Sequence, residues 1–289
     1  DIRSWVARRC LYSGFLQFSN HQEMKKKPAV ENILIVKADG SIVPFNAQKI
    51  RQSLLRSGAT SETIDHVIRN VESRLYQNIS TKKLYKMVFS ELRKKHLPSA
   101  GKYHLKRAIM ELGPTGFPFE NYISEVFKTQ GYKTQTGKII MGNCVKHEVD
   151  VIAENDTELF MMECKFHGEP GTVCDVKHAL YVSARFQDIG RKINVNKPGS
   201  KKFKGWLVTN TRMTSDAEQY GVCSGLQLMS WNFPKGKSLR EKINNTGLHP
   251  VTCITSLTKA EKNRLLERMV VMCKSLCKNP DVLAEIGIA

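Results

Sequence analysis

Charged residues interrupt two apolar segments near the middle of the chain. These segments read EVDVI at residues 148–152 and LFMMECK at residues 159–165. Successive side chains of a strand point to opposite faces of its sheet, so Glu163 and Lys165 share one face. The polar sequence ENDT that separates the segments favours a hairpin turn. Such a turn would bring Asp150 beside Glu163 and Lys165.

Two carboxylates and one ammonium on an apolar sheet carry a large desolvation cost unless they pair or hold a metal ion. Asp150 and Glu163 would bind Mg²⁺ or Mn²⁺, which activates a water molecule and neutralises a scissile phosphodiester, while Lys165 would orient the nucleophile. An edge hairpin whose charged face looks into solvent accounts for the spacing equally well. The Val, Ile, Leu, Phe and Met content of both segments favours central strands and therefore the catalytic interpretation.

A helix is predicted before these strands, at residues 116–127. Its apolar residues recur at helical spacing, namely Phe119, Tyr122, Ile123, Val126 and Phe127. Glu120 lies near the start of this helix, where it would approach the metal ion as a further carboxylate. His147, next to the acidic strand, is either a proton donor or a polar residue that begins the strand.

The succession of this helix, Asp150 and Glu163-Cys164-Lys165 resembles the PD-(D/E)xK nuclease core in its Mrr-like branch, which has the restriction-endonuclease-like fold. Later core elements are matched by helix, strand, helix and strand patterns at residues 177–186, 205–210, 215–220 and 226–231. The resemblance covers residues 114–232, and Val149 stands where the family motif has Pro. It implies a metal-dependent endonuclease acting on double-stranded DNA as a homodimer. The catalytic residues that it implies are Asp150, Glu163, Lys165 and Glu120.

The pattern changes over residues 33–112. Residues 33–45 predict two short strands joined by an Asp-Gly turn, a strong hairpin signal. Asn46 is suited to cap the following helix, whose apolar side carries Ile50 and Leu54. Further helices are predicted around residues 64–71, around residues 84–92 with Ser80 or Thr81 as cap, and at residues 99–112.

This module, with V-x-x-D-G followed by F-N-x-x-K-I, resembles the ATP-cone, the nucleotide-sensing module of ribonucleotide reductases and their repressor. The resemblance implies ATP or dATP as effector, held by Lys37, Asn46, Lys49 and Thr81. Ala38 stands where the family usually has Arg, which removes one cationic contact. Alternatively, the module is a hairpin with helices whose lysines are simply solvated. Because the chain contains no P-loop sequence, a nucleotide would be sensed rather than hydrolysed for work.

The chain carries 45 Lys and Arg residues against 27 Asp and Glu residues, a net charge of +18. This excess indicates a polyanionic partner, most simply nucleic acid. Residues 82–107 hold nine basic residues and one acidic, and residues 191–212 hold seven basic and none acidic. Both stretches suit contact with phosphates, although a charged run on a helix is most often a solvated face. No apolar run approaches the roughly 20 residues of a membrane-spanning helix, so no membrane is implied.

The eight cysteines form no C-x-x-C pair. Several lie in apolar segments, as is typical of reduced thiols in a cytoplasmic protein, and a zinc site is not favoured. Residues 1–32 are expected to form an extension without fixed structure, with a more natural start at Met24. A mitochondrial-type presequence is the alternative for residues 1–23.

Residues 233–289 show no catalytic signal and are expected to form a helical appendage. Helices are predicted at residues 259–268, with Thr258 as cap, at residues 269–276, and from Pro280 onward.

The sequence therefore predicts a two-domain protein of the α+β or α/β class. An ATP-cone at residues 33–112 would precede a restriction-endonuclease-like mixed sheet, flanked by helices, at residues 114–232. The predicted function is a Mg²⁺-dependent DNA endonuclease with a regulatory ATP- or dATP-binding domain. A nucleotide-responsive nucleic-acid-binding regulator that does not cut is the alternative, and a nuclease directed at RNA would use the same chemistry.

Overall fold

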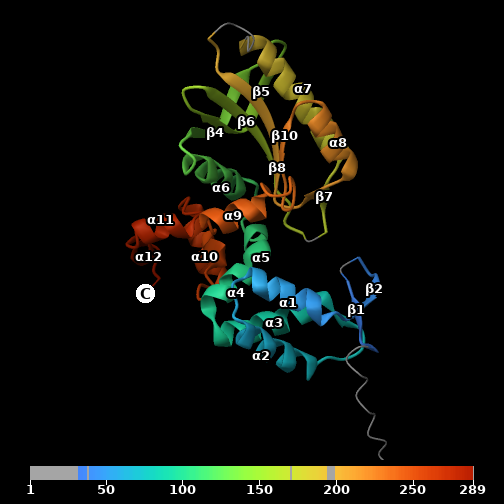
Figure 1. The fold of residues 1–289 in the computed structure, drawn as a ribbon. Helices are drawn as coiled ribbons and strands as arrows, with labels where there is room; N and C mark the ends of the chain where they lie inside the picture. The colour runs from blue at the N-terminus through green and yellow to red at the C-terminus, as the bar shows by residue number, and fades with distance from the viewer. Residues whose placement is uncertain (1–31, 38, 170, 194–198, 289) are drawn as a thin grey trace, which may run out of the picture.

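The computed structural model describes residues 32–37, 39–169, 171–193 and 199–288. The expectation for residues 1–31 falls outside this range. Figure 1 shows a mixed sheet with its helices at one end of the molecule and a smaller, mostly helical module at the other. The predicted α+β class with two such units is confirmed.

The N-terminal module contains a three-stranded sheet of order β2-β1-β3 and four helices. The elements are β1 (Leu34–Val36), β2 (Ile42–Pro44), β3 (Ile79–Ser80), α1 (Ala47–Arg56), α2 (Ser61–Glu72), α3 (Thr81–Lys95) and α4 (Leu97–Tyr103). The predicted hairpin turns at Asp39-Gly40, where Gly40 has a φ of 81° that glycine adopts without strain. Strand β3 was not predicted, because two residues between helices leave no pattern of their own.

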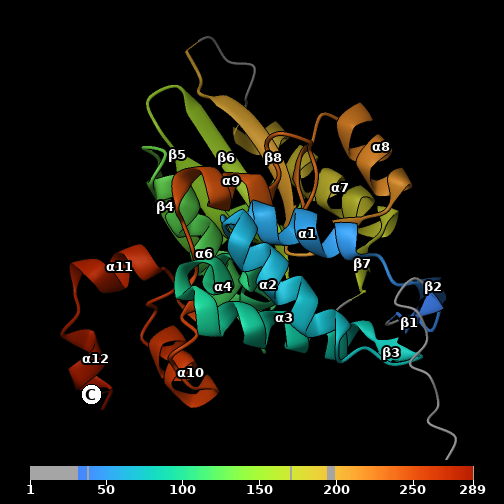
Figure 2. The ribbon, with the colours of Figure 1, turned by 60° about the horizontal axis from the view of Figure 1, so that its bottom comes forward.

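Capping side chains begin the helices of this module. Asn46 accepts a hydrogen bond from the Lys49 N–H at 3.1 Å, and Ser80 accepts one from the Lys83 N–H at 3.2 Å. Both act on amides that have no partner within the helix. A separate hydrophobic core joins these helices to β1 and β3, with Leu54, Ile64, Val67, Ile79 and Leu92 among its buried residues. Figure 2 shows α1, α2 and α3 packed beside one another.

The larger sheet has the strand order β10-β8-β6-β5-β4. Its strands are β4 (Lys133–Met141), β5 (Lys146–Glu154), β6 (Glu158–Lys165), β8 (Lys202–Thr209) and β10 (Gln227–Met229). The pairs β4–β5 and β5–β6 are antiparallel, whereas β6–β8 and β8–β10 are parallel. The prediction that the two charged strands, β5 and β6, are central in the sheet is therefore confirmed.

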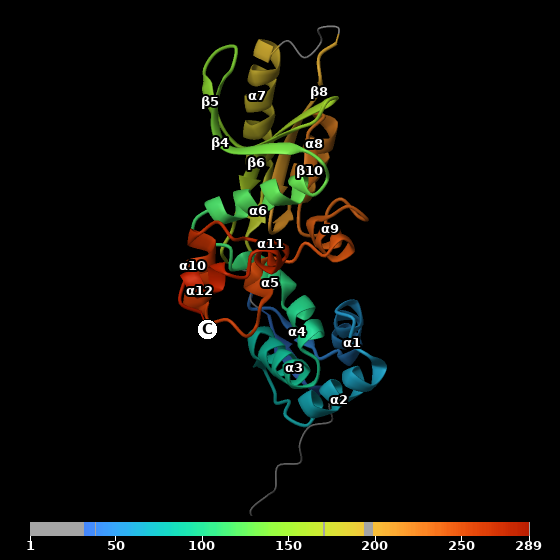
Figure 3. The same ribbon diagram turned by 90° about the vertical axis from the view of Figure 1, so that its left-hand side faces the viewer.

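Helices cover both faces of this sheet. One core cluster joins α6 (Phe117–Lys128) to one face, and a second joins α7 (Val176–Ile193) and α8 (Ser215–Cys223) to the other. Figure 3 shows α6 on the opposite side of the strands from α7. A short sheet of β7 (Val173–Cys174) and β9 (Arg212–Met213) lies outside the main one. Strand β4 was not predicted, because at the sheet edge it carries mostly exposed polar residues and little apolar signal.

The C-terminal segment consists of short helices packed on the larger core. They are α9 (Leu239–Thr246), η2 (Val251–Cys253), α10 (Lys259–Glu267), α11 (Cys273–Lys278) and α12 (Val282–Glu285). Thr258 caps α10 in a reciprocal capping box with Glu261. The helix predicted at residues 269–276 begins only at Cys273, because Met269 has a left-handed φ of 61°. Residues of α9 to α12 share one hydrophobic cluster with α6, so this segment is continuous with the central core.

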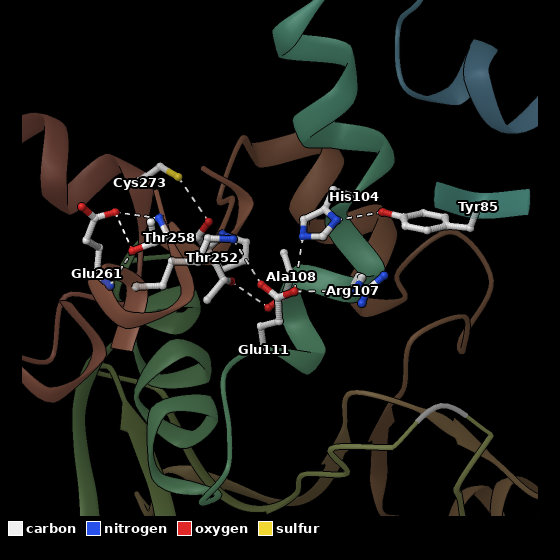
Figure 4. A network of polar contacts seen from close by, with 11 residues as sticks. Tyr85, His104, Arg107, Ala108, Glu111, Thr252, Thr258, Glu261 and Cys273 are labelled. Atoms are coloured by element: carbon white, nitrogen blue, oxygen red, sulfur yellow. Dashed lines mark hydrogen bonds and ion pairs between the residues drawn. The ribbon is translucent and has the colours of Figure 1, made fainter. Parts of the chain in front are cut away.

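Helix α5 (Leu105–Met110) connects the N-terminal module to the rest of the protein. The single helix predicted at residues 99–112 is two helices, α4 and α5, which meet at His104. The Tyr85 hydroxyl lies 2.8 Å from His104 Nδ1, and the other ring nitrogen of His104 lies 3.6 Å from Glu111 Oε1. Figure 4 shows His104 between these two partners. Lys262 of α10 contacts Glu111 at 3.2 Å. These contacts link α3, through α5, to the C-terminal segment.

Candidate active site

The hairpin of β5 and β6 brings Asp150 and Glu163 together. The strands pair Val151 with Met162, so Asp150 and Glu163 are the next residues of β5 and β6 beyond this pair. The charge of Glu163 acts on Asp150. In addition, Asp150 Oδ2 accepts a hydrogen bond from the Cys164 N–H at 2.6 Å.

The predicted alternation of faces along β6 is confirmed. Phe160, Met162 and Cys164 pack in the cluster that contains α6, whereas Met161 packs in the cluster that contains α7. Glu163 therefore lies on the α7 side of the sheet, and Lys165 follows two residues later.

Two cations neutralise Glu163, whose side chain is only 5% exposed. Lys165 Nζ donates to Glu163 Oε1 at 2.6 Å, and the Arg185 guanidinium donates to Oε2. A buried carboxylate needs such partners to offset its loss of hydration. Both oxygens of Glu163 are therefore engaged by positive charge.

Arg185 was not among the predicted site residues. It lies one helical turn after Tyr181 on α7, donates to the Tyr181 hydroxyl at 2.6 Å and stacks on its ring at 4.7 Å. It also donates to the main-chain carbonyl of Glu148 at 2.9 Å. The sequence signal was the pair of Tyr181 and Arg185 four residues apart, which shows that they meet but not that they reach Glu163.

Burial and neighbouring carboxylates raise the pKa of two acids at this site. Burial first, and then the charge of Glu163, raise the pKa of Asp150 to about 6. Glu120, in the first turn of α6, has its pKa raised to about 7 by burial, followed by the charges of Asp150 and Glu148. The structure thus places Glu120 within electrostatic reach of both predicted ligands.

The carboxylates of this site suit a divalent cation in their chemistry. Oxygen ligands are those that Mg²⁺ prefers, and Mg²⁺ is usually held by one or two carboxylates together with water and substrate phosphate. Asp150 and Glu163 would supply two carboxylates, although Lys165 and Arg185 already pair with Glu163. Within the ranges that the structure describes, no group of three or more His, Cys, Asp and Glu side chains is arranged to hold a metal ion.

His147 does not face the carboxylate pair. Its Nε2 contacts Asp188 Oδ2 of α7 at 2.8 Å, and Asp188 Oδ1 accepts from the Cys144 N–H at 2.9 Å. The hydrogen bond from His147, with those from Cys144, lowers the pKa of Asp188 to about 2. This pair fastens the turn between β4 and β5 to α7.

The four residues predicted to bind nucleotide are all exposed on the N-terminal module. Strand β1 runs parallel to β3 and pairs Val36 with Ser80, so Lys37 follows the end of β1 and Thr81 begins α3 directly after this pair. Asn46 caps α1 and Lys49 lies in its first turn, next to the other end of β1, where the Phe45 N–H donates to the Ile33 carbonyl. Lys37 and Thr81 therefore follow one end of β1, while Asn46 and Lys49 lie near its other end, four residues or about 13 Å away along the strand.

Comparison with known proteins identifies two parts of the chain. A model of the ATP cone domain matches residues 33–109, so this domain is present. A model described as AF1548-like, C-terminal, matches residues 249–289. An uncharacterized protein of Archaeoglobus fulgidus is 33% identical over 168 residues, which are 58% of this chain and 91% of that protein. The chain belongs to the AF1548-like family.

One solved structure of this family also matches the chain. The crystal structure of a protein of unknown function, AF1548, matches with a TM-score of 0.51 and 30% identity, over 61% of this chain and 90% of that chain. Can2 of Sulfobacillus thermosulfidooxidans, in complex with cyclic tetra-adenylate, gives a TM-score of 0.30 at 11% identity, over 63% of this chain and 50% of that one. This second score is too low to assign a fold or an activity. No helix in the described part of the chain is long and apolar enough to span a bilayer.

Proposed function

We propose that this protein is a divalent-metal-dependent endonuclease that hydrolyses phosphodiester bonds of double-stranded DNA. The observation that carries this proposal is that Asp150 accepts a hydrogen bond from the Cys164 N–H at 2.6 Å, next to Glu163, while the Lys165 ammonium lies 2.6 Å from Glu163. Two acids and a lysine on a central hairpin are the groups that metal-assisted phosphodiester hydrolysis requires.

Asp150 and Glu163 would hold Mg²⁺ or Mn²⁺ in this mechanism. The bound ion supplies a more acidic water and neutralises the phosphate. Lys165 would orient the attacking water and stabilise charge on the phosphate oxygens. Glu120 has a pKa of about 7, so near neutral pH it is able to accept a proton from the attacking water. The water oxygen forms the new bond to phosphorus as the bond to the leaving oxygen breaks.

A nucleotide bound to the ATP cone domain would regulate this activity. Lys37, Asn46, Lys49 and Thr81 are the proposed contacts for ATP or dATP. Each chain would contribute one catalytic site, so cleavage of both strands would require a homodimer. A non-cleaving regulator is the second candidate, and it is favoured by the engagement of both Glu163 oxygens by Lys165 and Arg185.

The test is cleavage of plasmid DNA with Mg²⁺ or Mn²⁺, with and without ATP and dATP. We expect Lys165→Ala to lower the cleavage rate at least about a hundredfold, since the lysine acts on the reacting phosphate. Lys128→Ala is the matched control, because Lys128 forms an ion pair of the same 2.6 Å length with Glu125 away from the site. Equal cleavage by both variants would remove the catalytic assignment, and cleavage by neither variant nor wild type would leave the non-cleaving regulator.

Nucleotide binding is tested separately with Lys49→Ala. We expect weaker binding of ATP and dATP in calorimetric titration, by roughly tenfold for one lost charged contact to phosphate. Lys274→Ala, an exposed lysine on α11, is the control and should bind as wild type does. The same affinity in Lys49→Ala as in the control would contradict the assignment of Lys49.

A further inference from the structure

Three basic side chains from separate elements meet where the N-terminal module joins the sheet. They are Lys106 of α5, Arg212 of β9 and Arg240 of α9. The main chain holds two of them in adjacent segments, because the Trp231 N–H donates to the Thr211 carbonyl at 2.8 Å and the Arg240 N–H donates to the Trp231 carbonyl at 3.3 Å.

Helix α5 completes this group of cations, which we call the junction cluster. Leu105 beside Lys106 and Leu239 beside Arg240 are buried in the same hydrophobic core, and Figure 1 shows α5 and α9 next to each other below the sheet. Burial, and then the positive charges of Arg212 and Arg240, lower the pKa of Lys106. Arg212 and Arg240 therefore both lie close enough to Lys106 to act on its charge.

No carboxylate forms an ion pair or hydrogen bond with the junction cluster in the described part of the chain, although Glu241 lies within electrostatic reach of Arg240. The neighbouring Glu241 is engaged by Ser238, whose hydroxyl donates to Glu241 Oε2 at 2.6 Å. Like charges held together cost free energy, and a bound anion would offset that cost.

The junction cluster lies beyond the same end of the sheet as the candidate active site. Lys165 and Thr209 are paired as the last residues of β6 and β8, and the Thr209 hydroxyl donates to the Lys165 carbonyl at 2.7 Å. Arg212 follows three residues after Thr209. A polyanion that reaches Lys165 would come to the junction cluster by continuing past this end of the sheet.

We propose that Lys106, Arg212 and Arg240 bind backbone phosphates of duplex DNA that extends from the active site toward the N-terminal module. Guanidinium groups match phosphate oxygens with paired N–H donors, and an ammonium adds a compact charge. The choice of DNA as the source of the phosphates rests on the proposed function. The contacts are to the backbone, so they hold any sequence and set the direction of the duplex.

The test measures binding of a labelled DNA duplex by fluorescence anisotropy in EDTA, over a series of salt concentrations. The variant combines Lys106→Gln, Arg212→Gln and Arg240→Gln. The control removes the same charge from exposed lysines of α10 and α11 that form no ion pair in the described structure, through Lys259→Gln, Lys274→Gln and Lys278→Gln. Loss of three phosphate contacts should make the negative slope of log affinity against log salt shallower by about three. The affinity at 0.1 M salt should fall on the order of a hundredfold.

Equal affinities and salt slopes in the two triple variants would overturn the proposal. A fall in ATP affinity with unchanged DNA affinity would also overturn it, because the junction cluster would then hold a free nucleotide. The thermal midpoint of the variant should equal or exceed that of wild type, since removing like charges that lie near one another relieves repulsion. Binding in EDTA does not depend on cleavage. If the protein binds DNA through the junction cluster but never cuts it, the proposed nuclease activity is refuted and the proposed DNA contacts are not.

Discussion

The charge balance of Glu163 is the central feature at the scale of single residues. Its two oxygens are shared between Lys165, two residues away on β6, and Arg185, which comes from α7. A metal ion at this site would have to compete with one of these cations. Arg185 is the one with a second set of partners, because Tyr181 and the Glu148 carbonyl also accept from it. We therefore expect Arg185 to limit the affinity for metal.

Replacing Arg185 tests this competition. In Arg185→Met, Glu163 keeps only Lys165, so we expect a loss of roughly 3 kcal/mol in the free energy of unfolding without metal. Addition of Mg²⁺ should then raise the thermal midpoint more in the variant than in wild type, because an ion that binds only the folded state stabilises it. Arg185→Lys keeps the charge and should behave like wild type. An equal response to Mg²⁺ in all three proteins would show that Arg185 does not compete.

At the scale of elements, α5 is the connection that matters for regulation. Its following residue Glu111 contacts Lys262 of α10 and faces His104, which itself contacts Tyr85 of α3. Partial burial alone would raise the pKa of Glu111, but His104 and Lys262 outweigh it, so that its pKa is lowered. The carboxylate is thus held in its charged form between the N-terminal module and the C-terminal segment.

Glu111→Gln should weaken this link while leaving the folds on either side intact. Because the carboxylate is one-third exposed, we expect a loss of only about 1 kcal/mol in the free energy of unfolding. ATP affinity should not change, but the effect of ATP on amide hydrogen exchange in α10 should become smaller. Glu285→Gln, which breaks an ion pair with Arg268 inside the C-terminal segment, is the control. If ATP still changes hydrogen exchange in α10 to the same extent, Glu111 does not transmit the effect of ATP from the N-terminal module to α10.

At the scale of the whole molecule, the protein contains separable hydrophobic cores. Buried residues from Ile33 to Ala100 form one cluster, and Leu105 through Ile286 contribute to another that includes the sheet and the C-terminal helices. The border falls between α4 and α5. The N-terminal module therefore has a core of its own, as independent cooperative units do.

We expect two transitions in differential scanning calorimetry for this reason. ATP should raise the midpoint of the transition that belongs to the N-terminal module, because a ligand that binds only the folded form stabilises that form; the shift corresponds to about 2.7 kcal/mol when ATP is present at about a hundred times its dissociation constant. The other transition should move less. A single transition that shifts as a whole would mean that the two cores unfold together.

The sequence by itself determined the local elements of both units. The Asp-Gly turn, the caps at Asn46 and Thr258, and the apolar spacing of α6 depend on neighbouring residues, so they were predictable. The alternation along β6 likewise fixed which side chains share a face with Glu163. These features follow from the short-range geometry of strands, turns and helices.

Only the tertiary structure decided which distant residues meet. Arg185 reaches Glu163 across 22 positions of the chain, and the junction cluster joins Lys106 to Arg212 and Arg240 from more than a hundred positions away. The exposed edge strand β4 and the packing of the C-terminal helices on α6 depend in the same way on the assembled core. Such contacts arise from strand order and helix packing, which place side chains in space without leaving a periodic pattern in the sequence.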